Sequence, residues 1–138
     1  MPPNVPVFCP IKGAAIGVVG SLPELPDDVV AEPLLAVPFV TVAAPTHAMA
    51  AQRGTVPVKT ASKHVQLVLT DRTPLTAGRD FAVQSPLTWR LADLGAKHAF
   101  LRAGLGWGHM PLHIVEEDLA AGRLKRLRIA DADPRYAQ

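Results

Sequence analysis

Proline is the residue that most limits what this chain can fold into, because 14 of its 138 residues are proline. Each proline fixes the backbone φ angle and removes a hydrogen-bond donor. Four of them crowd the first ten residues: Pro2, Pro3, Pro6 and Pro10. Neither a regular helix nor a central strand is expected there, so residues 1–12 are predicted to form a proline-rich arm. Cys9 lies in this arm and is interpreted as an incidental thiol, because a nucleophilic thiol requires an activating group.

Size and composition predict a single globular domain for the rest of the chain. The length falls within the roughly 50–250 residues typical of one domain. Apolar residues make up 49% of the chain and charged residues 19%, which excludes a disordered chain of high net charge. The net charge of +2 does not by itself predict a nucleic-acid surface. A single cysteine excludes an internal disulfide framework and is compatible with a reducing cytoplasm.

No segment has the length of a membrane span. The most apolar window, residues 33–45, is shorter than the roughly 20 residues that a span requires, and it contains Pro38 and Thr41. The first residues carry no basic segment of the kind that begins a signal peptide, and Lys12 interrupts the next apolar stretch. We therefore predict a soluble, cytoplasmic protein.

Five stretches are apolar or alternating in the manner of strands: residues 14–20, 34–44, 64–70, 89–92 and 123–129. The first is bounded by glycines, as in a strand buried on both faces. In the third, Val65, Leu67 and Leu69 alternate with their neighbours. The last is basic. Two prolines between the first two stretches predict a loop over residues 21–28.

Two longer helices and one short turn are predicted. Asp93 is a candidate N-cap, and Gly104 a candidate stop, for a helix with one apolar face. That face is made of Ala96, Ala99, Phe100 and Ala103. A second helix would begin at Pro111 and stop at Gly122. Its apolar stripe consists of Leu112, Val115 and Leu119, and residues 48–53 are predicted to form a helical turn. Strands alternating with helices predict an α/β fold with a largely parallel sheet.

The sequence supports no motif for catalysis, metal binding or cofactor binding. The glycines at 104, 106 and 108 follow a predicted helix, whereas a phosphate-binding loop must precede one. His109 and His113 are four residues apart, but no HExxH motif or cysteine pair accompanies them, so structural or solvent-facing roles are favoured. The remaining histidines have no evident partner in sequence: His47, His64 and His98.

Nucleophiles and paired acids are equally unpromising. No G-x-S-x-G elbow is present, and Asp27-Asp28 and Glu116-Glu117 are adjacent residues that point to different faces. We predict that the chain is not an enzyme. The basic run of residues 123–128 is interpreted as a solvated edge strand, because basic residues protect edges from unwanted pairing.

A binding role has better support, because small or polar residues follow several predicted strands. The carboxyl ends of strands form the edge where α/β sheets bind ligands. Aromatic and polar groups that could line such a site also lie near Gly108. The candidate site residues are Gly20, Ser21, Thr70, Asp71, Arg72, Asp93, Trp107 and His109. Ordinary capping of strand ends explains the same residues equally well.

The order of three segments resembles the C-terminal part of LysR-type transcriptional regulators. Residues 91–111 read Leu-Ala-Asp-Leu-Gly-Ala-Lys-His-Ala-Phe-Leu-Arg-Ala-Gly-Leu-Gly-Trp-Gly-His-Met-Pro, and residues 113–124 read His-Ile-Val-Glu-Glu-Asp-Leu-Ala-Ala-Gly-Arg-Leu. Upstream, residues 43–50 read Ala-Ala-Pro-Thr-His-Ala-Met-Ala, with Ala48 in place of a proline common in the family, and Glu32-Pro-Leu-Leu also fits. The resemblance covers roughly residues 13–128.

The resemblance implies an effector-binding domain with a type 2 periplasmic-binding-protein-like α/β fold. Two subdomains would be joined by crossover strands at residues 38–44 and 107–110, with a small organic effector, in many members an acid, bound between them. Ser21 and Thr70 would hydrogen-bond this effector, and Arg72 would pair with a carboxylate. Such a module binds its effector without turnover, needs no cofactor or metal, and is expected to form a homodimer.

Some segments of LysR-type regulators have no counterpart in this sequence. The family's helix-turn-helix and the first elements of its effector domain are not found in the sequence, so no direct DNA binding is expected. Residues 13–130 are predicted to be a partial effector-binding domain, with one subdomain mostly complete and the other partial, followed by a tail at 131–138. The alternative is a stand-alone or remnant interaction protein, which self-associates or pairs with an intact relative and binds no ligand.

Overall fold

The computed structural model describes residues 16, 27–70 and 83–130. The chain divides into two compact units, the first Met1–Ala36 with Asp71–Asp80 and the second Val37–Thr70 with Phe81–Gln138. The described residues of the first unit contain no helix or strand, and nearly all are exposed. The predicted arm at 1–12, the tail at 131–138, and the strand predicted at 14–20 (Ile16 apart) lie outside the described residues. All of the helices and strands in the described residues belong to the second unit.

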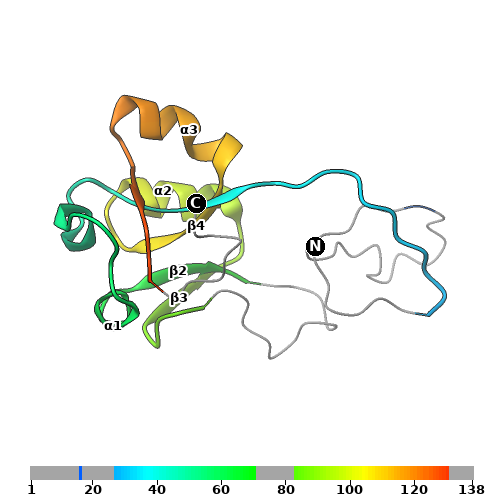
Figure 1. Ribbon diagram of the computed structural model, residues 1–138, viewed down its shortest axis with the longest axis horizontal. Helices are drawn as coiled ribbons and strands as arrows, with labels where there is room; N and C mark the ends of the chain where they lie inside the picture. Colours follow the sequence, from blue (N-terminus) through cyan, green and yellow to red (C-terminus); the bar gives the residue numbers. More distant parts are fainter. Residues whose placement is uncertain (1–15, 17–26, 71–82, 131–138) are drawn as a thin grey trace. The chain divides into compact units, whose positions relative to one another are not determined.

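The second unit contains a mixed five-stranded sheet in the order β3-β2-β4-β1-β5 (Figure 1). The strands are β1 (Phe39–Ala43), β2 (Gln66–Leu69), β3 (Thr88–Leu91), β4 (Trp107–Pro111) and β5 (Lys125–Leu127). Strand β2 runs parallel to β3 and β4, whereas β1 runs antiparallel to β4 and β5. The prediction of a largely parallel sheet was thus only half right. Hydrophobic periodicity reports which face of a strand is buried, and it carries no information about the direction of the neighbouring strand.

Four helical elements connect these strands: η2 (Ala48–Ala51), α1 (Val58–Ala61), α2 (Leu94–Arg102) and α3 (Leu112–Ala121). The ends of the two longer helices agree closely with prediction. Asp93 caps α2, and Gly104 and Gly122 adopt left-handed backbone just beyond α2 and α3, with φ of 79° and 76°. After α2, the amide of Leu105 donates to the carbonyl of Phe100, which is the bond of a Schellman motif. Pro111 is the last residue of β4 rather than the first of α3.

The core lies on both sides of the sheet because β1 and β4 alternate their side chains. Val40 and Val42 of β1 pack with Leu101 of α2 and Val115 of α3, in one cluster. Ala43 of the same strand belongs to a second cluster, whose other members are Met49, Ala50, Val56, Ala61, Trp107, Leu127 and Ile129. All five residues of β4 are buried, as expected of a central strand covered on both faces. The residues expected to form two crossovers are therefore neighbouring central strands of this unit.

The buried face of α2 matches the predicted one only in part, since Phe100 packs against the core as predicted. Ala99 and Ala103 are exposed, whereas Lys97 and Leu101 are buried. Alanines bury little apolar area, so they specify a face weakly, and the larger Leu101 decides which side contacts the sheet. Lys97 can lie on this side because its four-carbon stem is apolar. Within the described ranges, no helix has the length and apolar character to cross a membrane.

Candidate functional site

The carboxyl ends of β2 and β3 lie side by side and bring two predicted site residues to one edge of the sheet. The register pairs Leu69 with Leu91, and the amide of Thr70 donates to the carbonyl of Leu91 over 2.7 Å. Asp93 follows Leu91 by two residues, so it lies at this same edge. Four other predicted site residues fall outside the described part of the chain: Gly20, Ser21, Asp71 and Arg72.

Asp93 acts as the N-cap of α2. Its carboxylate accepts hydrogen bonds from the amides of Gly95, at 3.2 Å, and Ala96, at 3.1 Å. Free amides at a helix N-terminus can bind an anion. Because Asp93 already accepts from these two amides, the N-terminus of α2 offers less to an anion than an uncapped helix would.

Trp107 belongs to the hydrophobic core and is not exposed. It begins β4 and is paired with Gln66 at the start of β2, so it lies away from the carboxyl edge where Thr70 lies. The ring is fully buried, and its indole N–H donates to the carbonyl of Ala61 over 3.2 Å. The prediction that this ring lines a cleft is not met in the described unit, because the core requires a large side chain at this point.

His109 is buried in the same strand and has polar contacts on two sides. Its Nδ1 forms a 2.8 Å hydrogen bond with the hydroxyl of Thr41, and its ring meets that of Trp107 edge-on at 5.8 Å. Its backbone carbonyl accepts a 2.6 Å hydrogen bond from Nζ of Lys97. His113 is exposed, and in residues 27–70 and 83–130 no group of three or more metal-ligating side chains could hold an ion.

Lys97 is the polar residue of this region that sequence reasoning missed. Only 7% of it is exposed, and burial lowers the pKa of its ammonium group to about 8. Within the described residues no carboxylate lies within ion-pair distance of it. A signal was present in the sequence, since Lys97 stands three and four residues from Leu94 and Leu101, the apolar positions of the buried face.

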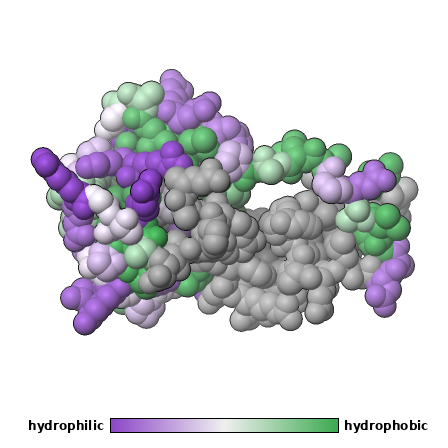
Figure 2. Space-filling view, in the orientation of Figure 1, coloured by the Kyte–Doolittle hydropathy of each residue, from purple (hydrophilic) through white to green (hydrophobic). Residues whose placement is uncertain are grey.

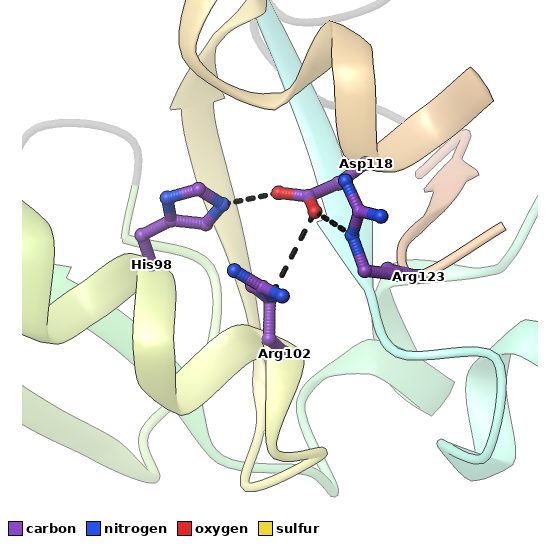
Figure 3. A network of polar contacts seen from close by, with 4 residues as sticks. All are labelled: His98, Arg102, Asp118 and Arg123. Carbon is purple, nitrogen blue, oxygen red and sulfur yellow. Dashed lines mark hydrogen bonds and ion pairs between the residues drawn. The ribbon is translucent and has the colours of Figure 1, made fainter. Parts of the chain in front are cut away.

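The other buried charge, Asp118 of α3, is surrounded by two arginines and a histidine (Figure 3). Its carboxylate contacts Nε2 of His98 at 2.5 Å, Nε of Arg123 at 2.5 Å and Nε of Arg102 at 3.6 Å. Burial acts to raise the pKa of Asp118, but the hydrogen bonds from Arg123 and His98 outweigh it and hold the pKa below its usual value. The network joins α2, α3 and the segment entering β5. His98 thus has a partner that its sequence neighbours did not indicate.

The basic run of residues 123–128 contains β5, which lies at an edge of the sheet as predicted. An open groove of about 420 Å³ runs beside it, lined by residues 52–54 and 125–128. Nζ of Lys125 donates to the carbonyl of Ala50 over 2.6 Å. Figure 2 shows strongly hydrophilic side chains gathered over the start of β5. These observations agree with a solvated, protected edge.

The histidines near η2 are also paired. His47 caps η2, since its Nδ1 accepts a 3.1 Å hydrogen bond from the amide of Met49, and its ring meets that of His64 at 5.1 Å. Burial, and to a smaller extent the charge of His64, lowers the pKa of His47. A neutral ring is required for this cap, because a protonated Nδ1 cannot accept.

Comparisons with known proteins show what the chain is similar to. The family model described as the LysR substrate binding domain matches residues 16–138. The regulatory domain of CcmR from Synechocystis PCC6803, in complex with 2-PG, has a TM-score of 0.59 and 19% identity, covering 79% of this chain and 55% of that one. The regulatory domain of NMB2055 (MetR) from N. meningitidis has a TM-score of 0.55 and 18% identity, covering 73% and 49%.

A third structure, the effector binding domain of QuiR in complex with shikimate, has a TM-score of 0.52 and 18% identity, covering 70% of this chain and 47% of that one. At these identities the likeness shows the fold, which is the expected type 2 periplasmic-binding-protein-like α/β fold. The chain spans about half the length of the structures it matches. No curated protein matches it significantly.

Proposed function

Because the chain belongs to the LysR substrate-binding domain family, we propose that it is the small-molecule effector-binding module of a LysR-type transcriptional regulator. The observation that carries this proposal is the match of the family model over residues 16–138, on a unit whose parallel strands end at one edge. The module binds its effector without chemical turnover. We place it in the cytoplasm, as a homodimer, where a regulator meets metabolites.

The effector is proposed to bind at the carboxyl edge of β2 and β3. Thr70 is proposed to hydrogen-bond the effector there. Ser21 is proposed to supply a further hydrogen bond and Arg72 to pair with a carboxylate of the effector, with Gly20 and Asp71 as their neighbours in sequence. Asp93 shapes the edge by capping α2, and Trp107 supports the position of His109 through their ring contact.

A small organic acid is the ligand class that this proposal favours. The structure of CcmR holds 2-PG and that of QuiR holds shikimate, and both compounds are acids. A buried cation in the described unit, Lys97, would favour the same class of ligand.

Thermal unfolding of the purified chain against a panel of organic acids and aromatic metabolites tests this function. A ligand that binds only the native state must stabilise it, by about 2.7 kcal/mol at 100 times its Kd. We expect one chemical class to raise Tm by several degrees, and Arg72→Gln to remove most of that rise. A sharp melt that no compound moves would contradict the proposal.

One observation favours a second function, that of an interaction protein that assembles through β3. In the described unit β3 is an edge strand, and three large apolar side chains beside it are substantially exposed: Leu69 at 42%, Leu87 at 50% and Trp89 at 47%. Exposed apolar side chains along an unpaired edge favour association with another chain. This function predicts assembly that rises with concentration and no saturable ligand.

A further inference from the structure

Strand β4 leaves space for the side chain of Lys97, because position 108 is a glycine. The lysine stem passes over Gly108 of β4, where an added Cβ would lie 3.3 Å from Lys97 Cε and 2.8 Å from the carbonyl oxygen of Leu67. A side chain at position 108 would therefore displace the stem. The head of the lysine reaches the carbonyl of His109 at 2.6 Å and is held there.

The ammonium group of Lys97 uses only part of its hydrogen-bonding capacity within the described residues. It carries three N–H donors, and one carbonyl accepts from it among the described residues. Burying a charge is costly unless the charge is paired, yet the described unit supplies no anion to this one. Asp118 differs in this respect, because that buried carboxylate contacts two arginines and a histidine.

The ammonium lies toward the carboxyl end of β4, since the carbonyl that accepts from it belongs to His109. Strand β2 is paired with β4 only between Gln66 and Trp107, whereas β4 continues beside β1 as far as Pro111. His109, which holds the lysine head, is two residues beyond that single pair, toward the carboxyl end. In α/β sheets this is the end at which ligands bind.

Arg90 of β3 also belongs to this part of the sheet, but it is exposed, whereas Lys97 is buried. The amides of Gly95 and Ala96 at the start of α2 are already bound by Asp93. Lys97 therefore supplies the positive charge that α2 brings to this edge. Because the ammonium is desolvated, its attraction for an anion is larger than that of an exposed lysine.

We propose that Lys97 binds the carboxylate or phosphate group of the effector, with the His109 carbonyl orienting its ammonium group and Gly108 providing the space for its stem. This inference rests on the proposed function and adds to it the residue that selects an anionic ligand. Burial supports it, since the lowered pKa of Lys97, about 8, still leaves the amine mostly protonated at neutral pH. An effector anion would supply the missing acceptors.

Isothermal titration of the native chain and its variants tests the role of Lys97. The probes are 2-phosphoglycolate, shikimate, benzoate, citrate and inorganic phosphate, with the methyl ester of shikimate as an uncharged counterpart. Lys97→Met keeps the apolar stem and removes the charge, and Lys97→Gln keeps an N–H donor for the His109 carbonyl. Lys63→Met is the matched control, because Lys63 is exposed.

For the acid that binds the native chain, we expect both Lys97 variants to bind at least tenfold more weakly. Lys63→Met should bind it with the affinity of the native chain. Unchanged affinity in Lys97→Met and Lys97→Gln would overturn the role of Lys97 while leaving the proposed function in place. If no probe binds the native chain, both are contradicted.

A measurement on the native chain alone covers the case in which the variants do not fold. Reductive methylation followed by mass spectrometry reports the reactivity of each lysine with and without the bound acid. The acid should slow methylation of Lys97 and leave that of Lys63 unchanged. Equal slowing at both lysines, or none at Lys97, would overturn the inference.

Discussion

The two buried charged side chains of the described unit, Asp118 and Lys97, have very different surroundings. Asp118 is buried with two arginines and a histidine around it, so its charge is compensated within the protein. Lys97 is buried against one carbonyl, so its charge is a cost to the native state. An effector anion, as proposed above, would reduce this cost by pairing with the ammonium group.

The cost of Lys97 predicts a pH dependence of stability. Its pKa falls from 10.5 to about 8 on folding, so the unfolded chain binds more protons than the native chain between these values. Stability should therefore rise as the pH increases from 8 toward 10.5. At 1.36 kcal/mol per unit, the contribution is of the order of 3 kcal/mol.

Urea unfolding of the native chain and Lys97→Met at pH 7 and pH 10 measures this contribution, because the subtraction removes the other titrating lysines. The free energy of unfolding of the native chain, less that of the variant, should increase by roughly 2–3 kcal/mol between the two pH values. A difference that stays constant with pH would show that Lys97 is not desolvated.

At the scale of helices and strands, polar side chains connect elements that sequence places far apart. Asp118 links α3 to α2 through His98 and to the start of β5 through Arg123. Asp93 performs a local task, since it closes the first turn of its own helix. The first kind of contact decides how the helices dock, and the second decides where a helix begins.

Asp118→Asn tests the contribution of this network. We expect a loss of about 1–2 kcal/mol at neutral pH, since charged hydrogen bonds are weakened while the half-exposed Arg102 and Arg123 are screened by solvent. Glu116→Gln, an exposed change on the same helix, should have no measurable effect. The measurement is the free energy of unfolding in urea.

The same variant has a predicted pH profile. The pKa of Asp118 is lower in the native chain than its usual 3.8, so its stabilising contribution is present above pH 3.8 and is lost as the pH falls below that value. The difference between the native chain and Asp118→Asn should therefore shrink at pH 3. A difference that persists in acid would mean that packing, not charge, explains the loss.

At the scale of the whole molecule, the exposed apolar side chains at β3 separate the two candidate functions. Trp89→Lys places a charge on this edge and should weaken any self-association at least tenfold, because charged edge residues oppose strand pairing. Sedimentation velocity over a range of concentrations provides the measurement. Leu105→Lys, the same type of change at a residue 44% exposed outside β3, should leave association unchanged.

The outcomes of this experiment bear on both functions. Association of the native chain that Trp89→Lys abolishes, together with an effector-dependent rise in Tm, supports a regulator that dimerises through β3. Association without any effector response favours the interaction protein. A chain that stays monomeric at every concentration contradicts assembly through this edge.

The sequence by itself determined the features that depend on a few neighbouring residues. Asp93 was identified as an N-cap, and Gly104 and Gly122 as helix stops, because capping and positive φ are local properties. The order of strands and helices between residues 39 and 127 also followed from local patterns, except that the short helix α1 was not predicted. The family, and with it the fold, was recognised from the order of short segments, which is likewise a property of the sequence.

Only the tertiary structure decided which residues meet across the chain. It buried Lys97 instead of the predicted alanines, joined His98 to Asp118, and enclosed Trp107 in the core. It also set β1 antiparallel to its neighbours. These outcomes depend on which helix face contacts the sheet and which strands become neighbours. Both are determined by packing between distant segments, where the largest apolar side chains dominate the free energy and a short sequence window holds no record of their partners.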